Sequence, residues 1–175
     1  EKNNYPIATQ GGKSGATPTH NLVAAYEYIG TPDPTNPYAN RDPRLAASVV
    51  TNGSTWNGRV IDQSAGATDD MANANASRTG YYLKKFLTDN LNLQQGQVAQ
   101  HNWVAYRWAE VLLNYAEAMN EAYGPDAVPA GYVMSARQAL QMVRDRASSK
   151  LPKVFAADQE AFREVVKHER RIELA

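Results

Sequence analysis

The sequence contains no cysteine, which excludes disulfides, thiolate metal ligands and thiol catalysis. No apolar run approaches the ~20 residues of a membrane-spanning helix, and the first residues lack the character of a signal peptide. The 18 basic residues balance 18 acidic ones, so no net charge favours nucleic acid or anionic lipid as a partner. What remains is a globular chain of 175 residues, 43% of them hydrophobic, which is long enough for one core and at most two small ones.

Catalytic and metal-binding patterns are also lacking. Residues 12–14 read Gly-Lys-Ser, like the end of a phosphate-binding loop, but that motif needs a glycine five residues earlier and Ile7 stands there. The histidines are far apart and lack the spacing of metal ligands. Glu110 and Glu117 share one helix face at about 10 Å, beyond either standard glycosidase separation. We therefore expect no enzyme activity, no metal and no cofactor.

Glycine and proline concentrate in residues 1–100, which sets this half apart from the rest. The segment 31–44, TPDPTNPYANRDPR, carries four prolines and indicates an irregular loop. A short amphipathic stretch is expected at 21–28 and a small polar, mobile loop at 64–79. Extended stretches are expected at 44–51, 59–64 and 80–87, the second closing an irregular hairpin around Asn-Gly.

The remainder of the chain predicts three helices, at about 103–123, about 132–147 and from Asp158 onward. The first two form an antiparallel pair with an alanine-lined seam. Trp103, Trp108 and Tyr115 lie at core-like spacing in the first helix, and we expect them to pack rather than to bind a ligand. The three apolar stripes are Ala109, Leu112, Ala116, Met119 and Tyr123; Ala136, Leu140, Val143 and Ala147; and Phe162, Val165, Val166 and Ile172.

Glu169 falls inside the apolar stripe of the third helix. A carboxylate there is costly to desolvate without a partner. We predict a structural ion pair with an arginine from another helix, and the candidates are Arg107, Arg144 and Arg146.

The last residues, HERRIELA at 168–175, end a helical pattern without any stop signal. Helices usually finish with glycine or asparagine past the last turn, or with a proline soon after. Here the final residues are good helix formers, and Glu173 lies on the unfavourable side of the helix dipole. We expect the helix, and the domain, to continue beyond Ala175.

Six stretches of the sequence resemble the SusD/RagB family of outer-membrane nutrient-binding lipoproteins. YRWAEVLLNYAEAMNEAYG, SARQALQMVRDRAS and HERRIELA follow the order and spacing of the family's C-terminal signature. THNLVAAYEY, NPYANRDPRLAASVV and RTGYYLKKF resemble its earlier landmarks, also in family order. The resemblance covers essentially the whole chain and implies a C-terminal portion, because the family continues past ERRIEL with Phe-Glu-Gly and has a further amino-terminal half.

The resemblance implies a mainly α, SusD-like fold. Tetratricopeptide-like helix pairs would lie beside a loop-rich lobe containing a few short β-strands. Residues 1–100 would form the loop-rich lobe and residues 101–175 the three-helix part. Both would belong to one SusD-like domain truncated at each end.

The implied function is binding without catalysis. The protein would capture oligosaccharides at the cell surface and deliver them to a SusC-like TonB-dependent outer-membrane transporter. Its membrane attachment would be a lipid anchor that is not present in this chain. Two alternatives remain open: a peptide-binding RagB-like member, and a helical-repeat scaffold for protein–protein contact.

Trp56 is the leading ligand-binding candidate by residue type. It lies between the Asn-Gly pairs 52–53 and 57–58, where an indole face can stack on a sugar while Asn52 or Asn57 bonds its hydroxyls. A purely structural role is favoured, because most large aromatic side chains are buried.

Tyr38 and Arg41, in the proline-rich loop, are weaker ligand-binding candidates. Arg41 and Arg44 are expected instead to bond loop carbonyls or to pair with Asp42. Irregular segments usually satisfy their backbone in this way, so the loop's arginines do not by themselves indicate a ligand.

Overall fold

The computed structural model describes residues 2–7, 11–102 and 104–175. So far as they are described, these residues form two compact units. Unit 1 consists of Glu1–Tyr26, Asp33–Ala39 and Leu45–Asn102, and unit 2 of Glu27–Pro32, Asn40–Arg44 and Trp103–Ala175. The two short segments from the first half of the chain therefore belong with the helices rather than with the loops around them.

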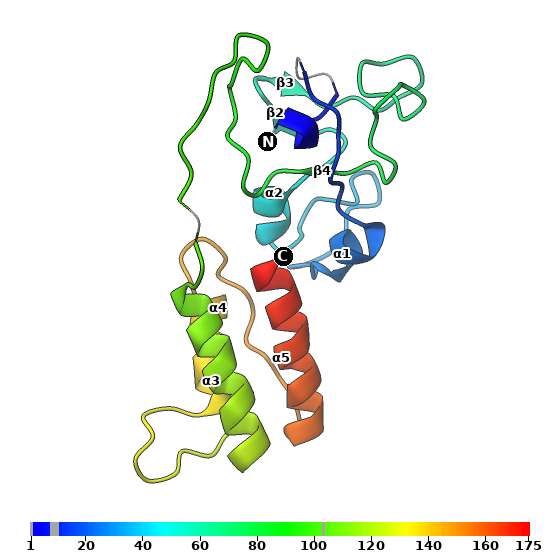
Figure 1. The fold of residues 1–175 in the computed structure, drawn as a ribbon. Helices are drawn as coiled ribbons and strands as arrows, with labels where there is room; N and C mark the ends of the chain where they lie inside the picture. The colour runs from blue at the N-terminus through cyan, green and yellow to red at the C-terminus, as the bar shows by residue number, and fades with distance from the viewer. Residues whose placement is uncertain (1, 8–10, 103) are drawn as a thin grey trace. The chain divides into compact units, whose positions relative to one another are not determined.

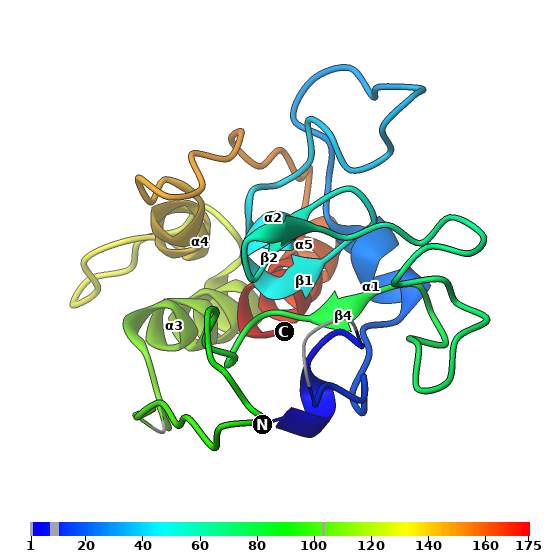
Figure 2. The same ribbon diagram turned by 90° about the horizontal axis from the view of Figure 1, so that it is seen from above.

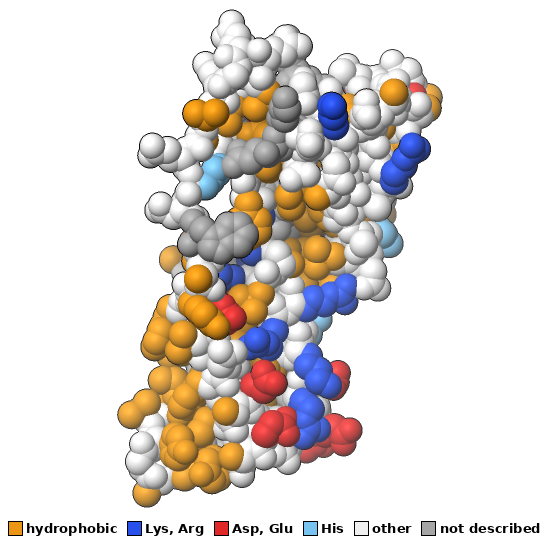
Figure 3. Space-filling model, viewed as in Figure 1, with side chains coloured by type: hydrophobic (Ala, Val, Ile, Leu, Met, Phe, Trp, Pro, Cys, Tyr) orange, Lys and Arg blue, Asp and Glu red, His pale blue; other side chains and the backbone are white. Residues whose placement is uncertain are grey.

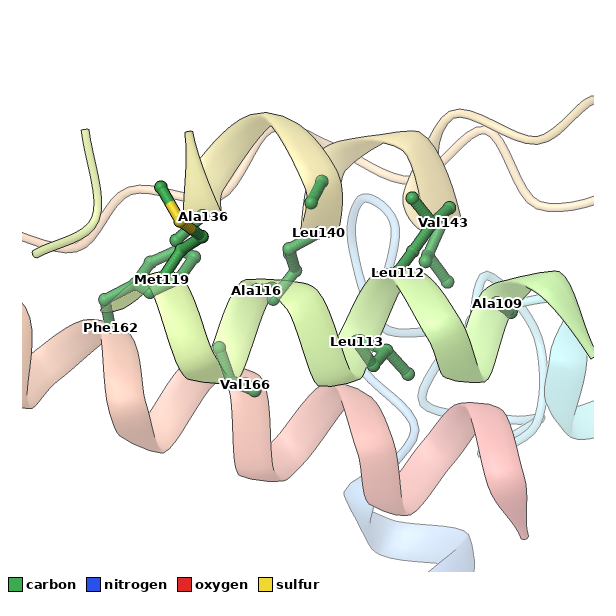
Figure 4. Close-up of a cluster of buried hydrophobic side chains, with 11 residues drawn as sticks. Ala109, Leu112, Leu113, Ala116, Met119, Ala136, Leu140, Val143, Phe162 and Val166 are labelled. Atoms are coloured by element: carbon green, nitrogen blue, oxygen red, sulfur yellow. The ribbon is translucent and has the colours of Figure 1, made fainter. Parts of the chain in front are cut away.

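Unit 2 is built on helices α3 (Trp108–Tyr123), α4 (Ala136–Arg144) and α5 (Gln159–Leu174). Helix α3 lies between the other two and runs antiparallel to both (Figure 4). Small and aliphatic side chains fill the space between them, so the expected alanine-lined seam is present. The buried cluster comprises Ala109, Leu112, Leu113, Ala116, Met119, Ala136, Ala139, Leu140, Val143, Phe162 and Val166.

Local signals in the sequence set the ends of these helices. Helix α3 ends at Gly124, whose φ of 82° suits a residue without a side chain. Helix α4 starts at Ser135, which forms a reciprocal capping box with Gln138. Asp158 caps α5 by accepting from the Ala161 N–H at 2.8 Å, as predicted.

Some helical expectations were wrong at the ends. Helix α3 begins at Trp108, and Trp108 is 65% exposed because it precedes the stripe residue Ala109 and faces another direction. Trp103 lies outside the described residues.

Tyr123, the last residue of α3, is 47% exposed and packs against Tyr132 in the following loop. Ala147 is exposed because α4 already ends at Arg144. Tyr115 does pack against the core, and its hydroxyl donates to the Met134 carbonyl.

Unit 1 has little regular structure. It holds a short 3₁₀ helix, η1 (Lys2–Asn4), and helix α1 (His20–Ala25). Strand β1 (Val49–Val50) pairs antiparallel with β4 (Tyr82–Leu83), and Figure 2 shows the two arrows side by side. Strand β2 (Thr55–Trp56) pairs with β3 (Arg59–Val60). The two-residue turn between them is Asn57-Gly58, so the expected hairpin is present, and both residues have the positive φ that such turns require, 51° and 76°. The chain is thus mainly helical with a few short strands, as expected.

The stretch 44–51 was expected to be a strand, but most of it is helix α2 (Arg44–Ser48). The preceding Asp42-Pro43 explains the difference. The Asp42 carboxylate accepts from the Arg44 N–H at 2.9 Å, and proline is favoured where a helix begins. Extended structure starts only at Val49.

The core of unit 1 is largely aromatic. Its buried members come from the amino-terminal segment, both strand pairs and the segment after β3. They are Tyr5, Val50, Trp56, Ile61 and Tyr82. Because these residues are far apart in sequence, the core depends on long-range contacts rather than on the periodicity of any one element.

The surface of unit 2 has two distinct faces. Hydrophobic side chains gather over α3 and the loop that follows it, whereas acidic and basic side chains mix along α5 (Figure 3). Tyr106, Val111, Tyr123, Val128, Tyr132 and Val133 are among the large exposed hydrophobic residues.

Candidate ligand-binding surface

Trp56 belongs to the core of unit 1 and not to its surface. The side chain is 1% exposed, and its ring meets the edge of Tyr5 at a centroid distance of 5.8 Å. With both faces covered, the indole has no surface on which a sugar could stack. The favoured structural role of Trp56 fits this position, and the stacking role does not.

Asn57 follows Trp56 in the sequence, and its backbone conformation forms part of the hairpin turn. Its φ of 51° places it in the left-handed region, where asparagine is one of the few tolerated side chains. The residue is half-buried at the tip of the hairpin. Its sequence position is therefore explained by the turn, whether or not the amide also reaches a ligand.

Tyr38 lies in an aromatic group with two residues from other segments. Its ring meets Tyr81 edge-on at a centroid distance of 6.2 Å, and His20 stacks on Tyr81 at 6.0 Å. The Tyr81 hydroxyl and His20 Nδ1 are 2.8 Å apart. Tyr81 is buried, Tyr38 is half-buried and His20 is exposed. We call these three residues the aromatic cluster.

Hydrogen bonds fix the segments that carry the aromatic cluster. Thr19 caps α1 immediately before His20 and so holds the imidazole at the start of the helix. The Ser77 hydroxyl donates to the Tyr81 carbonyl at 2.6 Å, and the Thr79 hydroxyl donates to the Pro18 carbonyl at 2.7 Å. The cluster is thus preorganised, which lowers the entropy cost of binding to it.

The aromatic cluster combines ring faces with polar edges. Rings of this kind pack against the C–H surface of a sugar, while hydroxyl and imidazole groups hydrogen-bond to its hydroxyls. Reasoning from the sequence named Tyr38 but not His20 or Tyr81 as a ligand-binding candidate. The signal that identifies them is spatial, because 61 residues separate His20 from Tyr81 in sequence.

Arg41 lies in unit 2, where it interacts with Tyr28. Its guanidinium carbon stands 4.1 Å from the centre of the Tyr28 ring, and Nη2 donates to the Tyr28 hydroxyl at 2.9 Å. The two residues also form an antiparallel β-bridge. Arg41 therefore closes the base of the proline-rich loop.

Glu169 is 1% exposed and lies between two arginines of unit 2. Its carboxylate oxygens accept from Arg144 at 2.8 Å and from Arg44 at 2.5 Å. Of the three predicted partners, the structure pairs Arg144 with Glu169, while Arg107 and Arg146 bond Glu173 instead. Helix periodicity could not reveal Arg44, which comes from the proline-rich loop.

Asp42, Glu27 and Glu173 complete what we call the ionic cluster, together with Glu169 and the four arginines. Burial alone would lower the pKa of Arg44, but its hydrogen bonds to Asp42 and Glu169 and the charge of Glu169 outweigh burial and raise it. Burial would raise the pKa of Glu173, but its arginine partners lower it below the usual range. Each carboxylate of the ionic cluster thus faces at least one guanidinium group, which indicates a structural rather than a catalytic cluster.

In 2–7, 11–102 and 104–175, no three histidine, cysteine or acidic side chains are grouped so that they can hold a metal ion. No helix in these ranges has the length and apolar character needed to cross a bilayer.

Comparison with known proteins gives one family. The model of the SusD family matches residues 1–175. No curated protein matches the chain. Proteins of the SusD family are non-catalytic binding proteins.

Two solved structures are similar in sequence and fold. A SusD-like carbohydrate-binding protein from Bacteroides fragilis NCTC 9343 is 29% identical, with a TM-score of 0.73, and the match covers 98% of this chain and 36% of that one. A SusD-like protein from the same organism is 28% identical, with a TM-score of 0.75, covering 99% and 37% of the two chains. The present chain thus spans little more than a third of their length and has a SusD-like structure.

Proposed function

Because this chain belongs to the SusD/RagB family and matches the C-terminal portion of SusD-like proteins, we propose that it is part of a glycan-capture protein. The full protein would bind oligosaccharides without transforming them. The observation that carries this proposal is the 29% identity, over 98% of the chain, to a SusD-like carbohydrate-binding protein.

The proposed partner is a SusC-like TonB-dependent transporter, to which the captured glycan would be delivered. The proposed location is the outer membrane at the cell surface, with a lipid anchor. The chain has no cysteine to carry that lipid, so the anchor belongs to another part of the protein.

The aromatic cluster is the proposed ligand-binding surface within unit 1. Four ligand-binding residues were expected from the sequence. Of these, Tyr38 has a ring that contacts another aromatic ring, that of Tyr81, and it is only half-buried. Asn57 and Arg41 have structural tasks that account for their positions, and Trp56 is buried. His20 adds an exposed polar edge beside Tyr81.

The test is a glycan-array and affinity-gel screen of the full-length protein and its variants. Tyr38→Ala removes a ring that would stack on the sugar, and losing it should weaken retention about 5- to 100-fold, corresponding to ~1–3 kcal/mol. Tyr38→Phe keeps the ring and should retain most of the binding. Tyr132→Ala removes a partly exposed tyrosine from unit 2 and serves as the matched control.

Each alternative function has its own outcome in this screen. Retention of peptides but no glycan would favour the hypothesis of a peptide-binding, RagB-like protein. Retention of neither, together with capture of a protein partner through the α3–α4 pair, would favour a scaffold. Equal glycan retention by Tyr38→Ala and the parent would move the site away from the aromatic cluster while leaving the capture function intact.

A further inference from the structure

The segment between α4 and α5, residues 151–157, belongs to no helix or sheet. Its sequence, LPKVFAA, carries no secondary structure in the described chain. Figure 1 shows it as the orange coil that leads from α4 to the start of α5. We call it the connecting segment. Outside helices and sheets, the backbone N–H and C=O groups must be satisfied by side chains, by solvent or by another chain.

Side chains of α4 satisfy one edge of the connecting segment. The carbonyls that face α4 belong to alternate residues, as the geometry of an extended chain requires. Pro152 O accepts from Arg144 Nε at 3.0 Å, and Val154 O and Ala156 O accept from the Arg137 guanidinium at 3.2 and 3.0 Å. The Val154 N–H donates to Gln141 Oε1 at 3.3 Å. Four hydrogen bonds thus satisfy this edge of the connecting segment.

The opposite edge is open. Neither the backbone nor the side chains of Lys153 and Phe155 have a hydrogen-bond or ion-pair partner within the described part of the chain. Phe155 is 90% exposed, so its ring and its main chain both face solvent. Adjacent residues of an extended chain point their N–H and C=O groups to opposite sides, so these are the free donors and acceptors of a strand edge.

A groove is lined jointly by the connecting segment and by α4. Its volume is about 730 Å³, and it runs along the connecting segment and the exposed side of α4. The lining combines apolar groups with one cation that has no described partner, Lys153. The lining residues are Arg137, Gln138, Gln141, Lys153, Val154, Phe155, Ala156 and Ala157.

We propose that residues 153–157 form a docking edge for an extended peptide segment of a partner protein, bound by β-strand addition. The main-chain groups of Lys153 and Phe155 would pair with the incoming strand, since groups two residues apart repeat at about 6.8 Å in both chains. Apolar side chains of the partner enter the groove beside Phe155. An acidic side chain would pair with Lys153, so the best match is a strand with an acidic residue at that position. This site is separate from the aromatic cluster and does not depend on glycan capture.

The first measurement is hydrogen exchange on the full-length protein. The amides of Lys153 and Phe155 should exchange rapidly in the free protein, whereas that of Val154 should be protected by Gln141. Adding a short threonine–valine peptide with glutamates on one face should protect the two outer amides. Protection of both amides before any peptide is added would overturn the proposal, because the protein's own chain would then cover the edge.

Variants separate the main-chain contact from the side-chain contact. Phe155→Ala removes the ring but keeps the N–H, whereas Phe155→Pro removes the N–H as well and leaves the bonds to α4 untouched. In fluorescence polarisation with the labelled peptide, the proline variant should bind roughly 2- to 10-fold more weakly than the alanine variant. Equal affinities for the two variants, with circular dichroism confirming that both are folded, would refute strand addition.

Charge reversal provides a gain-of-binding test that misfolding cannot mimic. The parent should prefer the glutamate peptide to its lysine counterpart by about 2- to 5-fold, and Lys153→Glu should invert that preference. Lys150→Glu, at an exposed lysine outside the groove, should leave it unchanged. Failure of both peptides to bind the parent, or the same preference in Lys153→Glu as in the parent, would count against the proposal.

Discussion

Each of the two units buries a carboxylate against arginine, but they do so differently. In unit 2, Glu169 sits on a regular helix and is shared by Arg44 and Arg144. In unit 1, Asp69 is fully buried in a loop and has one bidentate partner, Arg59, at 2.6 and 2.7 Å. The loop at 64–79, expected to be mobile, thus contains a buried charge. Burial of a charge requires closed hydrogen bonding rather than regular secondary structure.

The hydrophobic cores of the two units also differ, in how their residues are spaced along the sequence. That of unit 2 consists of aliphatic residues at helical spacing on elements that follow one another in sequence. That of unit 1 joins Tyr5, Trp56 and Tyr82, which are far apart along the chain. A change in unit 2 should therefore act through one helix and its neighbours, whereas a change in unit 1 should act through contacts that close long loops.

Glu169→Ala should have the largest effect. Removing the carboxylate leaves the four arginines of the ionic cluster facing three carboxylates, so one positive charge is uncompensated where Arg44 and Arg144 are 11% and 4% exposed. The expected loss is about 3–5 kcal/mol in the free energy of unfolding of unit 2. Guanidinium unfolding and hydrogen exchange of α5 amides in the full-length protein measure it. Glu164→Ala, which removes an exposed pair with Lys167, is the control and should cost less than ~0.5 kcal/mol.

Asp69→Ala should have a smaller effect than Glu169→Ala, although Asp69 is equally buried. Its partner Arg59 is 30% exposed, so water can solvate the guanidinium once the carboxylate is gone. We expect a loss of about 1–3 kcal/mol, seen as faster exchange of amides in residues 59–69. A loss as large as that of Glu169→Ala would show that exposure of the arginine does not set the difference between the units.

The contrast between local signals and long-range contacts also separates the features that could be predicted from the sequence from those that could not. Apolar periodicity and the cap at Asp158 predicted the helices of unit 2, since those signals are local. Arg44 escaped prediction as a partner of Glu169 because 125 residues separate the two, and no local rule brings them together. The hairpin at Asn57-Gly58 was predictable from its turn, but the aromatic cluster was not, since three distant segments supply it.

Gly58→Ala tests whether local turn chemistry contributes to unit 1 beside its long-range core. Gly58 has a φ of 76° and open space where a Cβ would stand, so the cost of alanine is backbone strain alone. We expect a loss of about 1–2 kcal/mol. Gly96→Ala, also at positive φ with open space, should cost a similar amount in thermal unfolding of the full-length protein, because neither site involves a steric clash.

Acid titration should give the smallest effect, and it distinguishes the units by which of them loosens first as the pH falls. The pKa of Glu173 is held below its ordinary value of 4.5 by Arg107, Arg44 and Arg146 against the opposing effect of burial. The unfolded chain therefore takes up the proton first as pH falls. The stabilisation is complete above the unfolded pKa and is lost as pH drops toward the folded one.

Hydrogen exchange of α5 amides between about pH 6 and pH 3 measures this loss. Glu173→Gln should lower stability at neutral pH and flatten the pH dependence, because the glutamine cannot titrate. Asp62 and Asp70 of unit 1 also have lowered pKa values, but their partners are turn hydroxyls and backbone N–H groups at exposed positions. Acid should therefore loosen α5 before it opens the unit 1 core. The reverse order would mean that the turn aspartates, and not the arginine-paired carboxylates, govern acid stability.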